Sequence, residues 1–256
     1  MPRMGTIIAI ANQKGGVGKT TSTINIAAAL AERGRRVLVV DLDPQGALTL
    51  ALGYDPTKLE ATVYDALVAG RGLREVVLET RPNLHLAPAT IDLSGAEVEL
   101  SSAIGREHVL RSKLDPLRDG YDTILIDCPP NLGLLTINAL TAADGLLIPV
   151  QCQFLSFRGM QLLLTMVTTV QERTNPRLRV VGILPTLYDS RTAHGREVLG
   201  ELRRAYADLL IDEPIRTRVA LADASAHGKS IFETDGTSDV ADAYRRVAEV
   251  IDGSQA

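Results

Sequence analysis

The residues with the clearest chemical potential form one glycine-rich run near the start of the chain. The run reads Gln13-Lys14-Gly15-Gly16-Val17-Gly18-Lys19-Thr20-Thr21. It follows an apolar stretch and precedes a helical pattern. Glycines let the backbone turn its N–H groups toward phosphate oxygens, and the N-terminus of a following helix adds partial positive charge. In such a loop Lys19 reaches the β- and γ-phosphates of a nucleotide, and the hydroxyl of Thr20 ligates Mg²⁺. The run therefore predicts a phosphate-binding loop.

This loop differs from the common pattern G-x-x-x-x-G-K-[ST] in two ways. Gln13 occupies the position of the first glycine, and Lys14 adds a second cation. A lysine at the start of the loop cannot easily curl onto the nucleotide that Lys19 holds. We therefore expect Lys14 to reach a phosphate bound by a second copy of the chain; the alternative is a lysine that is only solvated at the surface.

Carboxylates follow two apolar segments. Residues 37–40 lead into Asp41 and Asp43, and residues 124–126 lead into Asp127. Open α/β sheets bind ligands at the carboxyl ends of their strands, and alternation places Asp41 and Asp43 on one side if the strand continues. Hydrolysis of ATP needs a metal that is held in place and a water aimed in line with the leaving group. We expect the three carboxylates to share a buried edge with the phosphate loop, although a lone aspartate after a strand is more often a cap or turn residue.

Alternating strand and helix patterns connect these motifs. Strands are predicted at Thr6 to Ala11, Arg36 to Asp41, Leu84 to Ala87, Thr123 to Asp127, Gly145 to Gln151 and Val180 to Leu184. Helices are predicted at residues 18–33, 106–118, 133–143, 156–173, 194–208 and 238–252. Several strands are apolar without alternation, which is typical of a sheet covered on both faces. The order predicts an α/β fold, a doubly wound and mostly parallel sheet flanked by helices. From Gly53 to Pro88 the pattern is irregular and suggests a surface excursion with short helices, and we expect one domain over residues 1–256.

The composition fits that fold class. Of the 256 residues 45% are apolar and 23% charged, which excludes a disordered chain, and aromatic residues reach only 4%. Apolar runs stay well below the roughly 20 residues that cross a bilayer. Cys128 and Cys152 lie in apolar surroundings, and we see no signal-peptide pattern, so a disulfide framework is not expected. These features predict a cytoplasmic protein.

The formal net charge of −4, from 27 basic and 31 acidic residues, argues by itself against nucleic-acid binding.

The segment from Lys14 to Thr21 resembles the deviant Walker A motif of the ParA/MinD class of P-loop ATPases. The resemblance implies that Lys14 crosses the interface of an ATP-sandwich dimer and stabilises the γ-phosphate of the partner's nucleotide, as an arginine finger does. It also implies that Asp43 positions the attacking water and that Asp127 holds Mg²⁺ through water. The segments 41–46 and 128–131 correspond to switch I and switch II. Lys14, Lys19 and Asp43 are therefore the predicted catalytic residues, and ATP and Mg²⁺ the predicted ligands.

The second half of the chain carries a weaker resemblance. Asp189-Ser190-Arg191-Thr192 is similar to the D-x-R-T segment of ParA and Soj proteins, whose arginine belongs to a face that binds DNA without sequence preference. The stretches 219–224 and 228–229 also match that family. Its I-P-R-N approach to the adenine reads Ile215-Arg216-Thr217-Arg218 here, and its second DNA-binding arginine falls on Ala220. We expect Arg216 and Arg218 to take part in nucleotide binding and, with Arg191, in DNA binding.

The resemblance implies an ATP-dependent DNA-segregation ATPase. ATP would drive a homodimer that binds non-specific double-stranded DNA on the nucleoid, and a ParB-like protein would stimulate hydrolysis and release. The same chemistry could position a cargo other than DNA. An electron-transfer ATPase similar to the nitrogenase iron protein needs two cysteines per subunit; Cys128 and Cys152 supply the number but lie in no matching motif.

A membrane-cycling ATPase similar to MinD needs a basic amphipathic C-terminal helix. The predicted last helix has an apolar stripe formed by Val240, Tyr244, Val247 and Ile251. Its polar side carries Asp239, Asp242, Glu249 and Asp252 against Arg245 and Arg246. A membrane-surface helix would be more basic, so core packing is the favoured interpretation and no membrane partner is expected.

Overall fold

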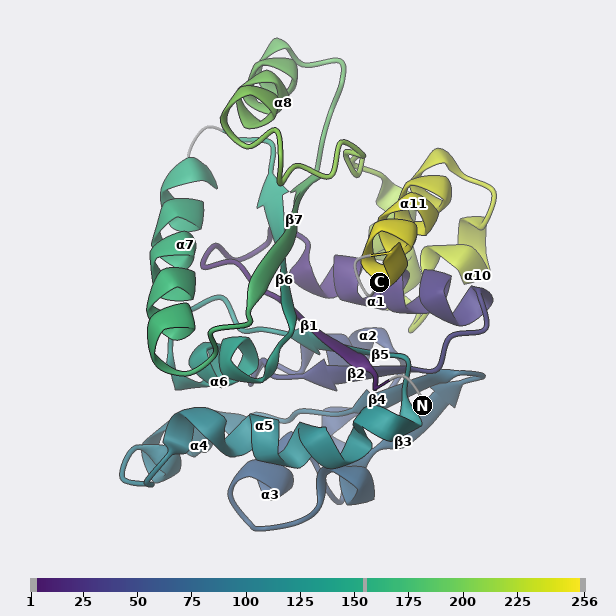
Figure 1. Cartoon of the computed structure of the whole chain (residues 1–256). Coiled ribbons are helices and arrows are strands. Elements are labelled where there is room, and N and C mark those ends of the chain that lie inside the picture. Colours follow the sequence, from purple (N-terminus) through teal and green to yellow (C-terminus); the bar gives the residue numbers. More distant parts are fainter. Residues whose placement is uncertain (1–3, 154–155, 254–256) are drawn as a thin grey trace.

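A computed structural model describes residues 4–153 and 156–253, and its centre is a seven-stranded sheet (Figure 1). The strands are β1 (Thr6–Ile10), β2 (Val37–Asp41), β3 (Leu78–Arg81), β4 (Leu84–Ala87), β5 (Thr123–Asp127), β6 (Gly145–Gln151) and β7 (Arg179–Thr186). Their order is β3-β4-β2-β5-β1-β6-β7, and every neighbouring pair is parallel except β3 with β4. The predicted doubly wound, mostly parallel sheet is confirmed.

Helices cover both faces of the sheet. They are α1 (Lys19–Glu32), α2 (Ala47–Ala51), α3 (Val63–Leu67), α4 (Leu93–Leu100), α5 (Val109–Leu114), α6 (Leu134–Ala142), α7 (Ser156–Arg173), α8 (Ala193–Ala205), α9 (Val219–Ala226), α10 (Ile231–Asp235) and α11 (Asp239–Gly253). One core lies under α3 to α8, and the other lies under α1, α2 and α9 to α11. Figure 1 shows α3, α4 and α5 on one side of the sheet and α1, α10 and α11 on the other.

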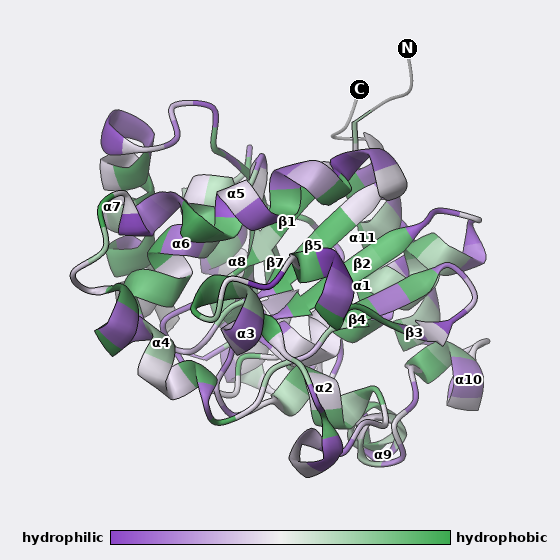
Figure 2. Ribbon diagram, turned by 90° about the horizontal axis from the view of Figure 1, so that it is seen from below, coloured by the Kyte–Doolittle hydropathy of each residue, from purple (hydrophilic) through white to green (hydrophobic). Residues whose placement is uncertain are grey.

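Strand β1 shows why the central strands read as continuous apolar runs. Ile7 and Ala9 pack into the first core, whereas Ile8 and Ile10 pack into the second. Successive side chains of a strand point to opposite faces, so a strand covered on both faces has no polar side. Figure 2 shows most of this strand layer in the green of hydrophobic residues. The same covering leaves the carboxyl ends of β1, β2 and β5 as the place where polar residues gather.

Several elements differ from the prediction, and helices α4, α9 and α10 were not predicted. Strand β3 was missed, because it is a half-buried edge strand with polar residues and pairs antiparallel with β4. The helix predicted at 106–118 is divided into a 3₁₀ turn (Arg106–His108), α5 and a second 3₁₀ turn (Asp115–Gly120). Pro116 lies in the first turn of that last segment, and its missing N–H group prevents α5 from continuing.

The apolar stripe predicted near the end of the chain lies on helix α11 and faces the core. Val240, Tyr244, Val247 and Ile251 are all buried in the core that α11 shares with α1. The prediction of core packing is confirmed. No helix within residues 4–153 and 156–253 has both the length and the apolar character that crossing a membrane requires.

Candidate functional site

The glycine-rich loop joins β1 to α1 at the centre of the sheet. Gly16 and Gly18 have φ angles of 71° and 84°, in the left-handed region that side chains other than glycine rarely enter. Gly18 is the N-cap of α1, and no side chain in the described part of the chain caps that end. The N–H groups of the first turn have no partner within the helix and are therefore available to an anion. This arrangement fits the triphosphate of a nucleotide.

The end of β7 holds the other side of this loop. The Thr186 hydroxyl donates a hydrogen bond of 2.7 Å to the carbonyl of Val17. Leu187, the next residue, has a φ of 50°, which is strained for a leucine. The strained turn directs the chain away from the sheet toward Arg191. No sequence pattern indicates this role of Thr186, because its contact with the loop spans 169 positions.

The two lysines of the loop have different surroundings. Lys19 is 7% exposed, and its Nζ donates to the carbonyl of Lys14 at 3.3 Å. Burial lowers the pKa of Lys19, and the nearby carboxylate of Asp127 opposes that shift. Nζ of Lys14 donates at 2.9 Å to the side-chain oxygen of Gln151 at the end of β6. Since this acceptor is a neutral amide, the charge of Lys14 is not paired with a carboxylate there.

Oxygen donors meet beside the loop where the sequence predicted a magnesium site. The Thr20 hydroxyl donates to Oδ2 of Asp127 at 2.7 Å, and the Thr23 hydroxyl donates to Oδ1 of the same carboxylate at 3.4 Å. Hydroxyl and carboxylate oxygens are the hard ligands that Mg²⁺ prefers. These residues fit the ion, with Thr20 as a ligand and Asp127 as an acceptor for a coordinated water. Bound Mg²⁺ would neutralise charge on the β- and γ-phosphates.

Two carboxylates lie deep in this edge of the sheet. Asp41 and Asp127 are register partners on β2 and β5. Burial raises the pKa of Asp127 to about 8, and the neighbouring Asp41 adds to that effect. Burial also raises the pKa of Asp41 to about 6, although hydrogen bonds from Thr49 oppose the shift. Ionisation of this pair therefore costs free energy, and a bound cation would reduce that cost.

Asp41 and Asp43 have different environments, which corrects the expectation of one buried edge. Asp41 is fully buried, and its Oδ2 accepts hydrogen bonds from the backbone N–H and the hydroxyl of Thr49, at 2.9 and 2.7 Å. Its Oδ1 accepts the backbone N–H of Asp43 at 3.2 Å. Asp43 is only half-buried, and its Oδ1 accepts the N–H of Gln45 at 2.9 Å. Asp41 thus fixes the switch I turn, while the side chain of Asp43 remains accessible.

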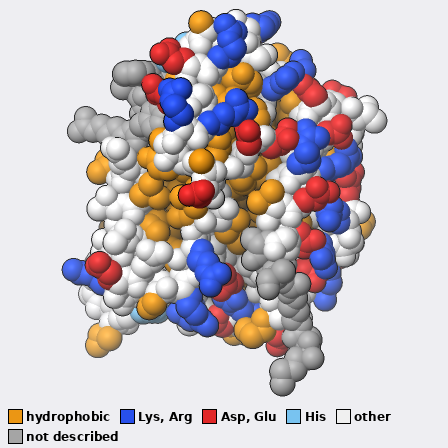
Figure 3. All heavy atoms as spheres, turned by 45° about the horizontal axis from the view of Figure 1, so that its top comes forward, with side chains coloured by type: hydrophobic (Ala, Val, Ile, Leu, Met, Phe, Trp, Pro, Cys, Tyr) orange, Lys and Arg blue, Asp and Glu red, His pale blue; other side chains and the backbone are white. Residues whose placement is uncertain are grey.

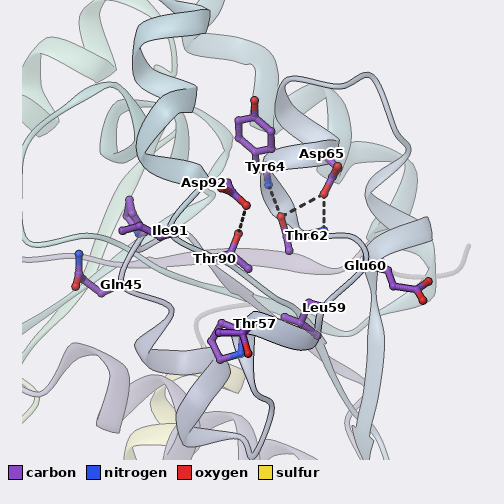
Figure 4. A pocket seen from close by; sticks show the side chains of 12 residues that line it. Gln45, Thr57, Leu59, Glu60, Thr62, Tyr64, Asp65, Thr90, Ile91 and Asp92 are labelled. Atoms are coloured by element: carbon purple, nitrogen blue, oxygen red, sulfur yellow. Dashed lines mark hydrogen bonds between the residues drawn. The ribbon is translucent and has the colours of Figure 1, made fainter.

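The switch I turn borders a hollow of about 500 Å³ (Figure 4). Pro44 and Gln45 line one side, and side chains from the segments 56–65 and 90–92 line the rest. Thr62 and Asp65 form a capping box at the start of α3, which keeps that wall in place. The loop that carries Asp43 therefore faces open space on this side.

The predicted DNA-binding arginines meet at the end of β7. The N–H of Tyr188 donates to the carbonyl of Ile215, and the N–H of Thr217 donates to the carbonyl of Tyr188, both at 3.0 Å. These bonds place the segment that leads to Arg191 beside the segment that carries Arg216 and Arg218. The three side chains are 88%, 53% and 50% exposed.

Each of these arginines contacts a carboxylate. Arg191 forms a fork with Asp189, with N···O distances of 2.9 and 2.8 Å. Arg218 forms a second fork with Asp239, and Arg216 reaches the same carboxylate at 3.4 Å. Figure 3, which brings the end of the molecule with α8 forward, shows basic and acidic side chains interspersed over the upper part of this face. The nucleotide role predicted for Arg216 and Arg218 stays a prediction, as do the catalytic and metal roles above.

Both cysteines are free thiols in the interior. Burial raises the pKa of Cys152 to about 11 and shifts the pKa of Cys128 in the same direction. A thiol that stays protonated at neutral pH is a poor nucleophile and a poor metal ligand. The cysteines therefore contribute packing to this edge of the sheet.

A glycine-rich anion loop at the start of a helix, a buried lysine over that loop and a Thr–Asp pair suited to Mg²⁺ together define a P-loop ATPase. Residues 5–180 match the family described as AAA domain. The sporulation initiation inhibitor protein Soj of Bacillus subtilis is 45% identical over 97% of this chain and 98% of Soj. The chromosome partitioning protein ParA of Myxococcus xanthus is 43% identical over 94% of this chain and 86% of ParA. The chain belongs to this ParA/Soj family of ATPases.

Solved structures agree on the fold and its ligands. A Mycobacterium smegmatis protein described as cobyrinic acid a,c-diamide synthase, with bound ADP and magnesium, is 44% identical. The match covers 96% of this chain and 93% of that chain, with a TM-score of 0.85. The same protein with an ATP analog and magnesium gives a TM-score of 0.84. The prediction of ATP and Mg²⁺ as ligands is confirmed.

Proposed function

We propose that this chain is a DNA-segregation ATPase whose ATP-bound dimer binds double-stranded DNA without sequence preference. The observation that carries the proposal is the pair of backbone hydrogen bonds at Tyr188, which gathers Arg191, Arg216 and Arg218 on one exposed face. Guanidinium groups bind phosphate oxygens through paired hydrogen bonds, and phosphate contacts carry no sequence information. Identity of 45% to Soj and 43% to a chromosome partitioning ParA supports the same function.

The ATPase chemistry assigns each residue of the site one task. Lys19 and the N–H groups of the loop hold the phosphates, while Thr20 and Asp127 hold Mg²⁺. Asp43 orients the attacking water, for which its half-buried position at the switch I turn leaves access. Lys14 stabilises the γ-phosphate of the nucleotide in the partner protomer, so a complete site requires the homodimer.

Residues at the end of β7 connect the nucleotide site to the arginine face, the exposed surface that carries Arg191, Arg216 and Arg218. The Thr186 hydroxyl bonds to Val17 in the phosphate loop, and two residues later Tyr188 bonds to the segment with Arg216 and Arg218. A displacement of the loop on ATP binding would therefore reach the arginines through β7. A ParB-like protein would stimulate hydrolysis and return the dimer to the state that releases DNA.

Retention of duplex DNA by the purified protein tests the proposal. With ATP and Mg²⁺ the protein should bind duplexes of unrelated sequence, and with ADP it should release them. If about three arginines per protomer contact phosphates, the affinity should fall with a log–log salt slope of about −5. Arg191→Ala should weaken binding, whereas Arg177→Ala, an exposed arginine near the opposite end of β7, should not. Absence of ATP-dependent binding at low salt would refute the proposal.

The Mycobacterium smegmatis relative raises a second candidate, an ATP-dependent amidation. If the chain released ammonia from glutamine itself, it would need an activated nucleophile, and the raised pKa values of Cys128 and Cys152 argue against either thiol in that task. Amidation also consumes a carboxylic acid, so the test supplies cobyrinic acid together with glutamine or ammonium, and we expect ATP turnover to stay unchanged. An increase with either compound would favour the amidation chemistry over DNA segregation.

A further inference from the structure

Asp239 lies at the start of α11, next to the arginine face. It is the first residue of α11, and its side chain is 40% exposed. Its Oδ1 and Oδ2 accept hydrogen bonds from Nε and Nη2 of Arg218, at 3.2 and 2.7 Å. Nη1 of Arg216 lies 3.4 Å from Oδ2. One carboxylate thus contacts two of the three arginines on the face.

We propose that Asp239 is an internal competitor of DNA, which occupies the guanidinium groups of Arg216 and Arg218 until phosphates displace it. A carboxylate and a phosphate both engage the same planar fork of N–H donors, so the two ligands exclude each other at Arg218. The inference rests on the proposed DNA function. It adds that Asp239 limits the affinity of the protein for DNA.

The partners of Asp239 distinguish this role from helix stabilisation alone. An acidic residue in the first turn of a helix is favourable without any arginine. Asp242 in the same turn pairs with Arg245 of its own helix, three residues away. Asp239 instead contacts arginines 21 and 23 positions earlier in the chain, on the segment that borders β7. Asp239 therefore binds the segment that carries Arg216 and Arg218, in addition to stabilising the start of the helix.

The charge of Asp239 also compensates repulsion on the face. Arg191 and Arg218 lie close enough that the charge of Arg191 acts to lower the pKa of Arg218, although the Asp239 hydrogen bond dominates and raises it. Asp239 offsets that repulsion and keeps the cations together. Removal of its charge would leave Asp189 beside Arg191 and the more distant charge of Asp235 near Arg218, and the local potential toward phosphate would increase. Asp239 therefore makes DNA binding weak and reversible.

Asp239→Asn tests the inference in the full-length protein with an ATP analogue and Mg²⁺. Asparagine keeps the shape and the first-turn position but removes the charge. We expect duplex DNA to bind about three- to tenfold more tightly, with a log–log salt slope more negative by about one to two, since the freed arginines gain phosphate contacts. Glu249→Gln is the matched control, because it removes an equal charge from the exposed polar side of the same helix, where Glu249 pairs with Arg33. It should leave the affinity unchanged.

A second variant tests whether the gain passes through the contact. In the Arg218→Ala background, Asp239→Asn should lose most of its effect. Equal affinities for Asp239→Asn and Glu249→Gln, or weaker binding by Asp239→Asn with an unchanged melting temperature, would overturn the inference and leave the DNA function standing. Failure of the wild-type protein to bind DNA would instead overturn the proposed function, and this inference with it.

Discussion

Replacement of Asp127 by asparagine should stabilise the protein in the absence of metal and nucleotide. Asp127 is 1% exposed, and burial raises its pKa from 3.8 to about 8. Asparagine has nearly the same shape, and its oxygen can still accept the hydroxyl of Thr20. The substitution therefore removes a carboxyl whose negative charge is costly at this buried position, and it keeps the closest contact. Because the same charge is useful for Mg²⁺, the variant should lose Mg²⁺-dependent ATP hydrolysis.

The pH dependence follows from the direction of that shift. Below pH 3.8 the carboxyl is protonated in both the folded and the unfolded chain and has no effect. Between pH 3.8 and about 8 the folded chain keeps the proton that the unfolded chain has lost, so the free energy of unfolding falls as the pH rises. At about 1.36 kcal/mol for each pH unit, the loss reaches about 4 kcal/mol at pH 7 and less than half of that at pH 5. Above pH 8 it is constant.

Urea denaturation in EDTA, without nucleotide, measures this difference. The Asp127→Asn variant should be more stable than the wild type by about 2 to 4 kcal/mol at pH 7 and by less than half of that at pH 5. Asp208→Asn, a substitution at an exposed position, is the control and should show no change at either pH. With Mg²⁺ and an ATP analogue, the wild type should gain more stability than the variant. A variant that is less stable than the wild type at pH 7, or a difference that does not depend on pH, would refute the reasoning.

Further predictions concern the loop, the switch and one tight backbone contact. Lys19→Ala should weaken ATP binding, measured by calorimetry, whereas Lys14→Ala should bind ATP but remain a monomer by light scattering; a normal ATP dimer of Lys14→Ala would remove its role across the interface. Asp43→Ala should bind ATP and dimerise while hydrolysing it about 10²-fold more slowly, and full turnover in a phosphate-release assay would contradict its water-positioning role. Gly228→Ala should destabilise the fold by about 1 to 3 kcal/mol in urea denaturation, because Gly228 has a φ of 68° and a Cβ there would lie 2.8 Å from Cα of Gly53; an unchanged midpoint would show that this contact relaxes.

The central strands could be predicted from sequence because they are buried on both faces. All five residues of β2 and of β5 are buried, so composition alone distinguishes them from helices and loops. Strand β3 has no such signal, since an edge strand alternates contacts with solvent and depends on its pairing with β4. The break between α5 and Asp115–Gly120 could have been predicted from Pro116, but the helical periodicity concealed it.

Only part of the candidate site could be predicted from sequence, because some of its contacts are local in the chain and others are distant. The phosphate loop is continuous in sequence, and its spacing alone indicates its chemistry. The partners of the loop are not continuous with it, because Gln151 and Thr186 lie 137 and 169 positions from the atoms that they contact. No pattern of residue types signals such contacts. They arise because the parallel sheet places the carboxyl ends of β1, β6 and β7 side by side.

The net charge of −4 shows why a total cannot decide whether a chain binds DNA. Asp41 and Asp127 are buried beside the phosphate loop, where Lys19 is close to Asp127, so they contribute little to a distant surface. Asp189 and Asp239 do contribute, because they contact the arginines that face the solvent. The relevant quantity is therefore the exchange of a carboxylate for a phosphate at each arginine. A face that is nearly neutral on its own can bind a polyanion weakly and release it, which is the behaviour that the proposed DNA-segregation function requires.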